Sequence, residues 1–452
     1  MPRSEIIAAA LRLYRAAAPV ALLVYSPFAL VRSLARRRRL GDLRGRLGLT
    51  SYPHLDGGIW IHAVSVGEVG VAHALLPPLS AGAPGRRIGV SVTTAAGREL
   101  AERTLAPRVS IFAFPFDLSG PVEKALSQTG PGLVLVTETE LWPLFLERAA
   151  RRGIPVALVN GRISERSFAR YRLVRRWFAR TLRHIALFAM QSPEDARRIE
   201  ELGAPSERIR LFGNIKYDAP SPGPFADGPR LRRAARGRPI VAAGSTADGE
   251  EEPVLEACAD LPRRPLLLLA PRRPERFDEV ARLIEKRGLR LLRRSSPESP
   301  VTSPETLPDV YLLDSIGELA SAYAEARLAF IGGSLVSSGG HNPIEAWAAG
   351  IPVVAGPHME NFGEIAARGE ALGVLRRVEG SAGLRRALAE SLDSPSELSQ
   401  RGERAARFVE SSRGAAERTA QAVLELAPHL SVESRLVPPL PAAEDPGERD
   451  LP

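Results

Sequence analysis

A chain of 452 residues, 44% of them hydrophobic and 25% charged, has room for two or three domains with their own cores. Its single cysteine, Cys258, excludes a fold held together by internal disulfides. A formal net charge of +9 indicates an anionic partner, which is either a nucleic acid or a membrane or phosphorylated substrate.

The N-terminal segment combines an apolar stretch with a cluster of arginines. Residues 16–31 carry no charge, but this run is shorter than the roughly 20 residues of a spanning helix. Pro19 and Pro27 also disfavour one straight helix. The arginines of residues 32–46 favour binding to anionic lipid and place the next domain on the cytoplasmic side. We therefore expect residues 1–46 to anchor the chain by spanning the bilayer or lying in its interface, with a buried helix as the alternative.

Short apolar runs alternate with helical stretches through the rest of the chain. In the first half these runs are IWIHAVSV, RIGVSVTT, VSIFAFP, LVLVTE, PVALVN and IALFAMQ. A second series contains RPIVAAGST, PLLLLAP, LRLLRR, VYLLD, LAFIGGS and PVVAG. Runs rich in Val, Ile and Leu with helical crossovers are typical of parallel sheets covered on both faces.

This pattern predicts an α/β protein with two doubly wound, Rossmann-like domains, at residues 47–218 and 238–430. Residues 219–237 are rich in Pro, Gly and Ala and indicate a linker. A helix near 401–427 should close the second domain, and residues 431–452 should be disordered. Ligands of open parallel sheets bind beyond the carboxyl ends of the strands, so we expect functional groups at those ends, facing a cleft between the domains.

The first candidate, Glu68, follows the run IWIHAVSV at a turn and opens a helix. An acid at this position can favour the helix N-terminus through the helix dipole. A carboxylate at a strand end can equally act as a general base. The position alone does not decide between these two roles.

The next candidates are two acids, Glu138 and Glu140, which follow the run LVLVT. They could cap the helix that begins near Leu141, or they could take part in chemistry. A metal-binding pair is disfavoured because no cluster of His or Asp residues accompanies them.

Lysine occurs at only three positions and asparagine at four, although arginine is abundant. The lysines and asparagines that remain are therefore candidates for roles that need their particular side chains. Lys216, in LFGNIKYD before the linker, could neutralise negative charge that develops during a reaction. Asn160 ends an earlier strand beside Arg162, where an anionic substrate or only solvent could be the partner.

The second domain carries features suited to a nucleotide. Arg272 follows a buried run, and arginine suits phosphate or carboxylate. Glycines at 332–333 and 339–340 would let backbone N–H groups approach a ligand closely. A helix that opens near Pro343 offers its positive end to phosphate, and Glu345 could accept hydrogen bonds from ribose hydroxyls.

Eight short strings occur along the chain in the order HAVSVGE, TETELWP, NGRISERS, GNIKYD, APRRPERF, DSIGEL, GGS and GGHNPIE. From the anchor to about residue 425, this ordered set resembles the 3-deoxy-D-manno-octulosonic acid (Kdo) transferases of lipopolysaccharide assembly. The resemblance implies the GT-B fold, with two Rossmann-like domains facing a cleft. It also implies transfer of Kdo from CMP-Kdo to a lipid A precursor, with inversion, at the cytoplasmic side of the inner membrane.

The resemblance also assigns roles to individual residues. Glu68 matches the family's catalytic base, and Glu138 and Lys216 match positions that assist the transition state. The CMP-binding segments are matched by Pro271, Arg272, Ile316, Gly317, Glu318, Asn342, Pro343, Ile344 and Glu345. The implied partners are the CMP-Kdo donor, the lipid A precursor and an anionic membrane surface. No metal and no cofactor is implied, because CMP-Kdo is a substrate.

Three positions depart from the family pattern. Ala247 and Arg273 stand where the family usually has His, and Ala346 stands where it usually has proline. The first two lie in segments on the donor side, so they bear on contacts with the donor and not on the class of reaction.

Two other functions are compatible with parts of this sequence. Another GT-B enzyme, such as a lipid disaccharide synthase or an epimerase that uses a UDP-sugar, would share the fold, and fold does not determine function. A nucleic-acid-binding protein would spread its positive charge along a groove with interleaved aromatic residues. Here aromatic residues make up only 6% and the charge excess flanks the apolar segment, so no nucleic-acid partner is expected.

Overall fold

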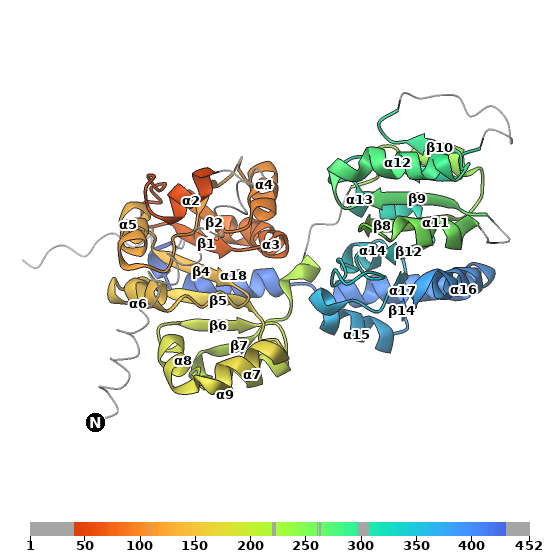
Figure 1. Ribbon diagram of the computed structural model, residues 1–452. Coiled ribbons are helices and arrows are strands. Elements are labelled where there is room, and N and C mark those ends of the chain that lie inside the picture. The colour runs from red at the N-terminus through yellow and green to blue at the C-terminus, as the bar shows by residue number, and fades with distance from the viewer. Residues whose placement is uncertain are drawn as a thin grey trace, which may run out of the picture. The chain divides into compact units, whose positions relative to one another are not determined.

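The computed structural model describes residues 40–106, 108–218, 223–259, 261, 264–296 and 307–430. They form two compact units (Figure 1), of which the first holds residues up to Asp218 and from Arg413 onward, and the second those in between. The predicted anchor lies outside the described residues except for α2 (Leu40–Arg46), and the predicted disordered tail lies outside them entirely. Every helix in the described part is too short or too polar to cross a membrane.

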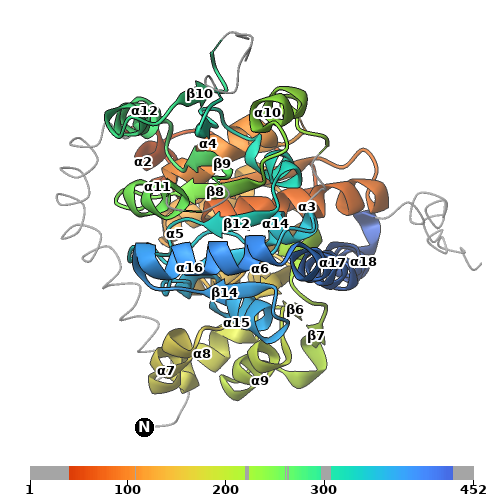
Figure 2. The ribbon, with the colours of Figure 1, turned by 90° about the vertical axis from the view of Figure 1, so that its right-hand side faces the viewer.

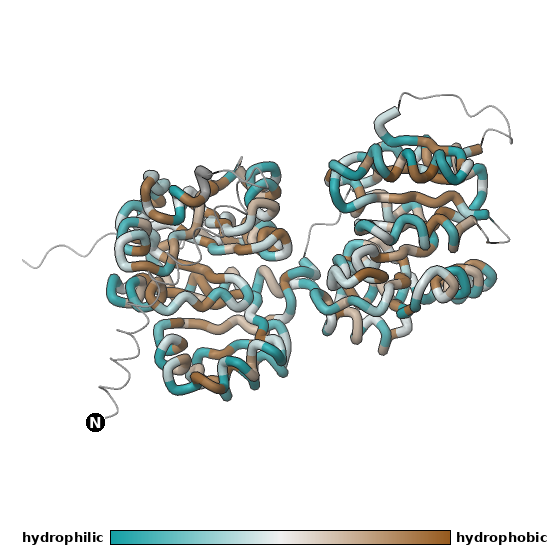
Figure 3. The backbone as a smooth tube through the Cα atoms, in the orientation of Figure 1, coloured by the Kyte–Doolittle hydropathy of each residue, from teal (hydrophilic) through white to brown (hydrophobic). Residues whose placement is uncertain are grey.

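The first unit is built on a seven-stranded parallel sheet in the order β3-β2-β1-β4-β5-β6-β7. Its strands are β1 (Ile59–Ala63), β2 (Ile88–Val92), β3 (Ser110–Ala113), β4 (Leu133–Thr137), β5 (Val156–Gly161), β6 (Leu187–Met190) and β7 (Ile209–Leu211). Every residue of β1, β2, β4, β5 and β6 is buried, as expected for a sheet covered on both faces. Figure 3 shows these strands as hydrophobic segments between helices of mixed character.

Alternate residues of each strand point to opposite sides of the sheet. Both faces of this sheet are apolar, and helices cover both. Ile59 and Ile61 of β1 join one apolar cluster, and Trp60 between them joins the other. The helices are α3 (Val66–Gly82), α4 (Ala95–Thr104), α5 (Ser119–Thr129), α6 (Pro143–Arg151), α7 (Glu165–Leu173), α8 (Arg175–Leu182) and α9 (Pro193–Glu201). Two short 3-10 helices, η1 (Ser206–Arg208) and η2 (Ile215–Asp218), precede the crossing to the second unit.

The predicted end of the second domain, at residue 430, is wrong. The last helix of the described residues belongs to the first unit. The single helix expected near 401–427 is two helices, α17 (Pro395–Ser411) and α18 (Ala415–Glu425), separated at Gly414 with φ +90°. Val423 and Leu424 of α18 belong to the same apolar cluster as α3, so residues 413–430 are not part of the second domain. The sequence shows an amphipathic helix here, but local periodicity does not reveal which core buries it.

The second unit repeats the architecture with the strand order β10-β11-β9-β8-β12-β13-β14, again entirely parallel. Its strands are β8 (Ile240–Thr246), β9 (Leu266–Pro271), β10 (Leu291–Arg293), β11 (Val310–Leu312), β12 (Leu328–Ile331), β13 (Val353–Ala355) and β14 (Leu375–Arg377). Figure 2 shows β9, β8, β12 and β14 one below another, with α11 (Glu251–Ala259) and α12 (Phe277–Lys286) on one side. The other helices are α13 (Leu319–Ala322), α14 (Ile344–Ala348), α15 (Gly363–Ala371) and α16 (Gly380–Asp393).

Part of the predicted linker is also folded. Residues 228–235 of the segment 219–237 form α10 (Gly228–Ala235), which buries Leu231 and Ala234 in the second unit. An Arg- and Ala-rich stretch has high helix propensity, and here that propensity prevails over the Pro and Gly residues around it.

Candidate functional site

Glu68 lies in the first turn of α3, just beyond the carboxyl end of β1, and only 6% of its surface is exposed. The Val64 backbone N–H donates to Glu68 Oε2 at 3.0 Å, and the Ser65 hydroxyl donates to Oε1 at 3.0 Å. The Thr137 hydroxyl, at the end of β4, lies 2.5 Å from Oε2. The carboxyl group is therefore held by three contacts at the edge of the sheet.

The pKa of the Glu68 carboxyl is subject to two opposing influences. Burial raises its pKa above the ordinary value, and the nearby negative charge of Glu138 raises it further. Hydrogen bonds from Thr137, Val64 and Ser65 lower the pKa, because they stabilise the ionised form. A buried carboxyl with a raised pKa and fixed orientation has the properties of a general base.

Glu138 and Lys216 form an ion pair beside Glu68. The Lys216 ammonium lies 2.7 Å from Glu138 Oε1, and both side chains are less than one-fifth exposed. Glu138 follows β4 in the left-handed region, with φ +52°, which is uncommon for a residue with a side chain. Lys216 also lies over Gly67, since a Cβ at Gly67 would be 3.8 Å from its Nζ. The structure thus brings together the three residues that the sequence predicts for catalysis.

Glu140, which the sequence singled out without a definite role, is a third carboxyl of this group. Trp142 donates from Nε1 to its Oε2 at 3.0 Å. Burial raises the pKa of Glu140 to about 7, the charge of Glu68 adds to this, and the Trp142 hydrogen bond opposes it. Glu140 therefore carries a proton for part of the time at neutral pH.

Two of the rare asparagines hold the segment that carries Lys216. Asn160, buried at the end of β5 with φ +53°, accepts from the Ile215 backbone N–H through Oδ1 at 2.9 Å. Asn214 accepts from the Lys216 backbone N–H at 3.0 Å. Asn160 thus holds the Lys216 segment, and an anionic-substrate surface at its neighbours Arg162, Ser164 and Arg166 stays a prediction.

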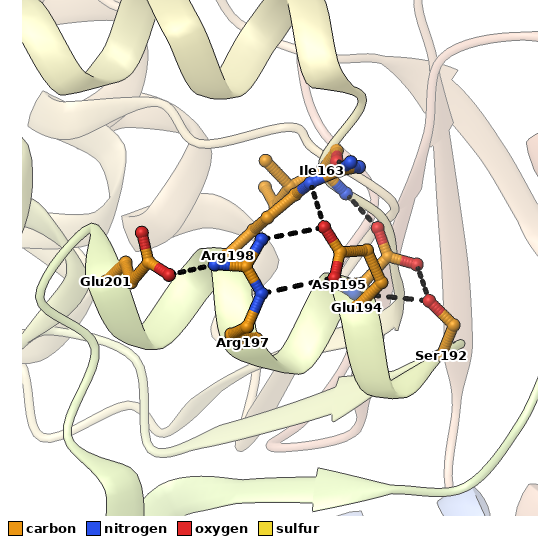
Figure 4. A network of polar contacts seen from close by, with 7 residues as sticks. All are labelled: Ile163, Ser192, Glu194, Asp195, Arg197, Arg198 and Glu201. Atoms are coloured by element: carbon orange, nitrogen blue, oxygen red, sulfur yellow. Dashed lines mark hydrogen bonds and ion pairs between the residues drawn. The ribbon is translucent and has the colours of Figure 1, made fainter.

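The loop after β5 is fixed by a network centred on Asp195 (Figure 4). Asp195 Oδ1 accepts from the Ile163 backbone N–H at 2.6 Å, and its Oδ2 accepts from the Ser192 hydroxyl at 2.6 Å. Arg198 donates to the Ile163 carbonyl at 2.9 Å. This network ties the end of β5 to the start of α9 and so supports the edge of the sheet that carries Asn160.

The predicted CMP-binding residues lie at the carboxyl edge of the second sheet. Pro271 and Arg272 are at the end of β9, residues 316–318 follow β11, and residues 342–345 lead into α14. Asn342 Oδ1 accepts from the Ile344 backbone N–H at 3.1 Å, which closes an Asx turn just before α14. Pro343 and Ile344 are buried, so their side chains shape this turn.

Arg272, His341 and Glu345 lie close enough to affect one another. Burial lowers the pKa of His341 to about 4, and the positive charge of Arg272 lowers it further. Burial raises the pKa of Glu345, while Asn342 and the charge of Arg272 lower it. The Arg272 side chain is exposed and pairs with no carboxylate of the described residues, which leaves its guanidinium open to an anionic ligand.

The segment 316–318 exposes backbone groups, and the carboxylate of its one acid, Glu318, is engaged in hydrogen bonds. Glu318 receives hydrogen bonds from the Ser315 hydroxyl and from Arg294, the latter at 3.2 Å. Gly317 has φ +91°, and the Ile316 side chain is 43% exposed. Glu318 therefore holds this turn in shape, and the exposed Ile316 and Gly317 form its outer side. That these three residues contact CMP stays a prediction.

The expectation for the first pair of glycines is wrong. The backbone N–H groups of Gly333, Ser334 and Leu335 donate to the buried carboxylate of Glu250, at 2.5, 2.8 and 2.8 Å. The Ala247 N–H also donates to Glu250, at 2.8 Å. These amides bind a side chain of the protein itself and cannot cradle a phosphate at the same time. Glu250 stands in the string GSTADGEEE, where its neighbours are also acids and gave no sign of this role.

Among the described residues, no group of three or more His, Cys, Asp or Glu side chains is arranged to hold a metal ion. That transfer needs neither metal nor cofactor stays a prediction. The sequence analysis also missed Thr137, which bridges β4 and Glu68. A hydroxyl at the last position of a buried strand is the one sequence signal that could have indicated it.

The chain matches a family model described as 3-deoxy-D-manno-octulosonic-acid transferase (kdotransferase) over residues 38–219. The 3-deoxy-D-manno-octulosonic acid transferase of Haemophilus influenzae is 36% identical, with 86% of this chain and 91% of that protein covered. The enzyme of the same name from Bordetella pertussis is 33% identical, with 84% and 90% covered. The solved structure of a calicheamicin glycosyltransferase matches with a TM-score of 0.51 at 17% identity, over 82% of this chain and 99% of that one, which shows likeness of fold alone.

Proposed function

The chain belongs to the 3-deoxy-D-manno-octulosonic acid (Kdo) transferase family of GT-B glycosyltransferases, and we propose that it transfers Kdo from CMP-Kdo to a lipid A precursor, with inversion. The observation that carries the proposal is the cluster of Glu68, Glu138 and Lys216 at one edge of the first sheet. A buried acid with a raised pKa beside an ion pair provides both a proton acceptor and a fixed positive charge.

In this proposal Glu68 is the general base. A carboxylate has about four lone-pair positions, and the three contacts with Val64, Ser65 and Thr137 leave one for a substrate hydroxyl. The hydroxyl oxygen of the acceptor sugar attacks the anomeric carbon of Kdo and forms the new glycosidic bond. Its proton passes to Glu68, and CMP departs with the electrons of the broken carbon–oxygen bond.

Thr137 gives Glu68 a partner in both protonation states. Its hydroxyl lies 2.5 Å from Glu68 Oε2 and 2.8 Å from the His62 carbonyl, but it has a single proton to donate. When Glu68 is ionised, Thr137 donates to it. When Glu68 has taken the acceptor's proton on Oε1, the oxygen with the free position, Thr137 still donates to Oε2. The base therefore keeps a hydrogen bond through the transfer.

Lys216 supplies positive charge as the donor bond breaks. Its pairing with Glu138 fixes the ammonium, and a fixed charge stabilises developing negative charge without reorganising at the moment of reaction. We assign this role toward the CMP phosphate or the Kdo carboxylate.

We assign donor binding to the second unit. The exposed Arg272 guanidinium suits the phosphate, the turn at 316–317 and the buried wall at Pro271 suit the nucleoside, and Glu345 suits ribose hydroxyls. Ala247 and Arg273 leave the region without the two histidines usual in the family, so Arg272 and Arg273 together would carry recognition of the phosphate.

We further propose that residues 1–46 hold the enzyme at the cytoplasmic face of the inner membrane. The apolar run and its arginines support this location, because apolar burial and attraction to anionic lipid add to each other. A lipid acceptor would then be within reach in the same bilayer.

The test is to incubate the purified protein with Kdo, CTP, a CMP-Kdo synthetase and a lipid A precursor, and to detect the product by mass. We expect one or more Kdo additions with CMP-Kdo and none with UDP-sugars. Glu68→Gln should reduce transfer by about 10²–10⁴-fold. Glu102→Gln, a surface change on α4, should leave it unchanged. Transfer from a UDP-sugar alone would refute the proposed donor, and an active Glu68→Gln protein would refute the proposed base.

A further inference from the structure

The turn between α7 and α8 exposes two apolar side chains at its tip. Leu173 is 86% exposed, more than any other large apolar side chain of the described residues, and Val174 beside it is 48% exposed. The helix α7 that leads into this turn has no fully buried residue. Exposed apolar groups of this kind are a sign of a contact surface when they are grouped and surrounded by charge.

The surrounding charge is almost entirely positive. Between residues 165 and 183, which we name the α7–α8 corner, Glu165 is the single exposed acid. The exposed arginines of this corner are Arg166, Arg170, Arg172, Arg175, Arg176, Arg180 and Arg183. Within the described part of the chain none of these seven forms an ion pair with a carboxylate.

The neighbouring helix α9 shows the usual arrangement for comparison. There Arg197 pairs with Glu194 and Glu201, as Figure 4 shows, and Arg198 also pairs with Glu194. Surface arginines on α9 are thus neutralised locally, whereas those of the α7–α8 corner leave their charge available to an external anion.

Aromatic residues fix the inner side of the corner. Tyr171 stacks on the buried Phe178 with ring centroids 4.3 Å apart, and Phe168 and Trp177 pack against the same core cluster. These rings face the protein, so the outer surface offers Leu173, Val174 and guanidinium groups. Single-stranded nucleic acid would need outward rings on which bases could stack, which disfavours it as the partner.

The corner follows directly on the strand end that carries Asn160. Burial raises the pKa of Tyr171, Arg170 lowers it, and the charge of Glu140 raises it. The chain enters α7 from the end of β5, where Asn160 holds the Lys216 segment.

We propose that the α7–α8 corner is a membrane contact in addition to the N-terminal segment, with Leu173 and Val174 entering the bilayer interface and the arginines binding anionic lipid headgroups. Apolar burial and attraction of clustered arginines to anionic lipid act together at such a surface. This inference rests on the proposed function in one respect, since a lipid acceptor would reach the candidate site from the same bilayer.

The test uses the full-length chain with a fluorophore at the corner. Its native Cys258 is buried, and burial raises the pKa of that thiol to about 12, so an introduced surface cysteine can be labelled selectively. Leu173→Cys carries an environment-sensitive dye, and Leu211→Cys, at an exposed leucine of the same unit that lies far in sequence from the N-terminal anchor, is the matched control. Neither donor nor acceptor is present, so the readout is independent of the transfer reaction.

With vesicles that contain phosphatidylglycerol, we expect a blue shift of the dye at position 173 and little change at position 211. Replacing Arg172, Arg175 and Arg176 by Gln in the labelled protein should raise the lipid concentration at half-maximal shift by about tenfold or more. The same charge change at Arg282, Arg385 and Arg386 of the second unit should not. Phosphatidylcholine vesicles or high salt should weaken the response of the unsubstituted corner.

Absence of a shift at position 173, or an equal shift at position 211, would overturn the proposal. A shift that RNA abolishes at constant ionic strength, by displacing vesicles from the corner, would leave the surface anion-binding but not specific for membranes, and would also overturn it. A normal shift in a protein that fails to transfer Kdo would refute the proposed function and leave this membrane contact standing.

Discussion

The ammonium nitrogen of Lys216 lies 2.7 Å from Oε1 of Glu138, and this ion pair stands beside the more deeply buried carboxyl of Glu68. The arrangement separates two tasks. Glu68 keeps its proton-accepting function because Lys216 is engaged with Glu138 and does not hold the pKa of Glu68 down. Glu138 in turn fixes the position of Lys216, the lysine that the sequence predicts for catalysis.

Replacing Lys216 tests whether its charge acts in the transition state. We expect Lys216→Ala to lower kcat by about 10²-fold, with a smaller effect on the KM for CMP-Kdo, because the lost interaction is strongest as the donor bond breaks. Lys216→Arg should restore only part of the activity, since a planar guanidinium does not occupy the place of a compact ammonium. Steady-state kinetics of both variants provides the measurement.

Two further proteins define the role of Lys216. Lys286→Ala removes an exposed lysine from α12 and should behave as wild type. The double variant Glu138→Gln/Lys216→Ala removes the pair together. If it regains activity, Lys216 serves only to neutralise Glu138, and our assignment toward the donor fails.

Thr137→Val should shift the pH dependence of transfer. Valine keeps the shape of threonine but loses the hydroxyl that lowers the pKa of Glu68, so that pKa should rise. Because Glu68 must be ionised to accept a proton, the acid limb of kcat/KM should move to higher pH. Thr137→Ser, which retains a hydroxyl, should leave the limb near its wild-type position. An unshifted limb in Thr137→Val would show that Thr137 does not influence the base.

Glu140→Gln should stabilise the fold at alkaline pH. The pKa of Glu140 rises from an ordinary value of 4.5 to about 7 in the folded protein, so the native state holds its proton more tightly than the unfolded state. The stability associated with this group is complete below about pH 4.5 and is lost as the pH rises through about 7. Glutamine carries no charge and still accepts from Trp142, so it avoids this loss.

The measurement is thermal unfolding of wild type and Glu140→Gln at acid and alkaline pH. After allowance for solvent screening, we expect the free energy of unfolding of Glu140→Gln to exceed that of wild type by about 1–2 kcal/mol at high pH. This difference should disappear in acid. Glu99→Gln, on the exposed side of α4, should show no difference at either pH. A difference that does not vary with pH would point to packing and not to ionisation.

Strand ends could be predicted from the sequence because parallel strands need continuous apolar runs, and the polar residue that ends each run is visible. Glu68 and Glu138 each lie just beyond a strand that the pattern indicates, as the rule for open sheets predicts, whereas Lys216 follows β7, a three-residue strand that the apolar runs did not indicate. The rarity of asparagine and lysine in the sequence was informative as well. Asn160, Asn214, Asn342 and Asn361 all make side-chain hydrogen bonds to backbone groups at turns, and Lys124 donates to the Gly48 carbonyl.

What the sequence could not predict depends on contacts between distant segments. Glu250 accepts from backbone groups more than 80 residues away, and nothing in its local acidic string separates it from Glu251 or Glu252. The packing of α18 in the first unit also depends on contacts between segments that are distant in the sequence. Asp218 accepts from the Gly414 and Ala416 N–H groups at 2.5 and 2.6 Å, which joins the start of that helix to the residue before the crossing.

The position of α18 leads to a prediction about fragments of the second unit. A fragment of residues 220–412 ends where that unit ends, whereas one extended to residue 430 carries α18 without α3 to cover Val423 and Leu424. We expect the shorter fragment to be monomeric and to bind CMP, because the residues assigned to the donor all lie within it. The longer fragment should self-associate or bind an apolar dye, since it exposes a face that the whole chain buries.

Calorimetry with CMP and size-exclusion chromatography measure the two outcomes. Within the shorter fragment, Arg272→Gln should weaken CMP binding by about tenfold, because a charged hydrogen bond to phosphate is lost. Arg287→Gln alters a surface ion pair with Glu252 and should have no effect on CMP binding, so it controls for net charge. If CMP binds only when residues 413–430 are present, then donor recognition requires the returning helix, and the assignment of the site to the second unit alone is refuted.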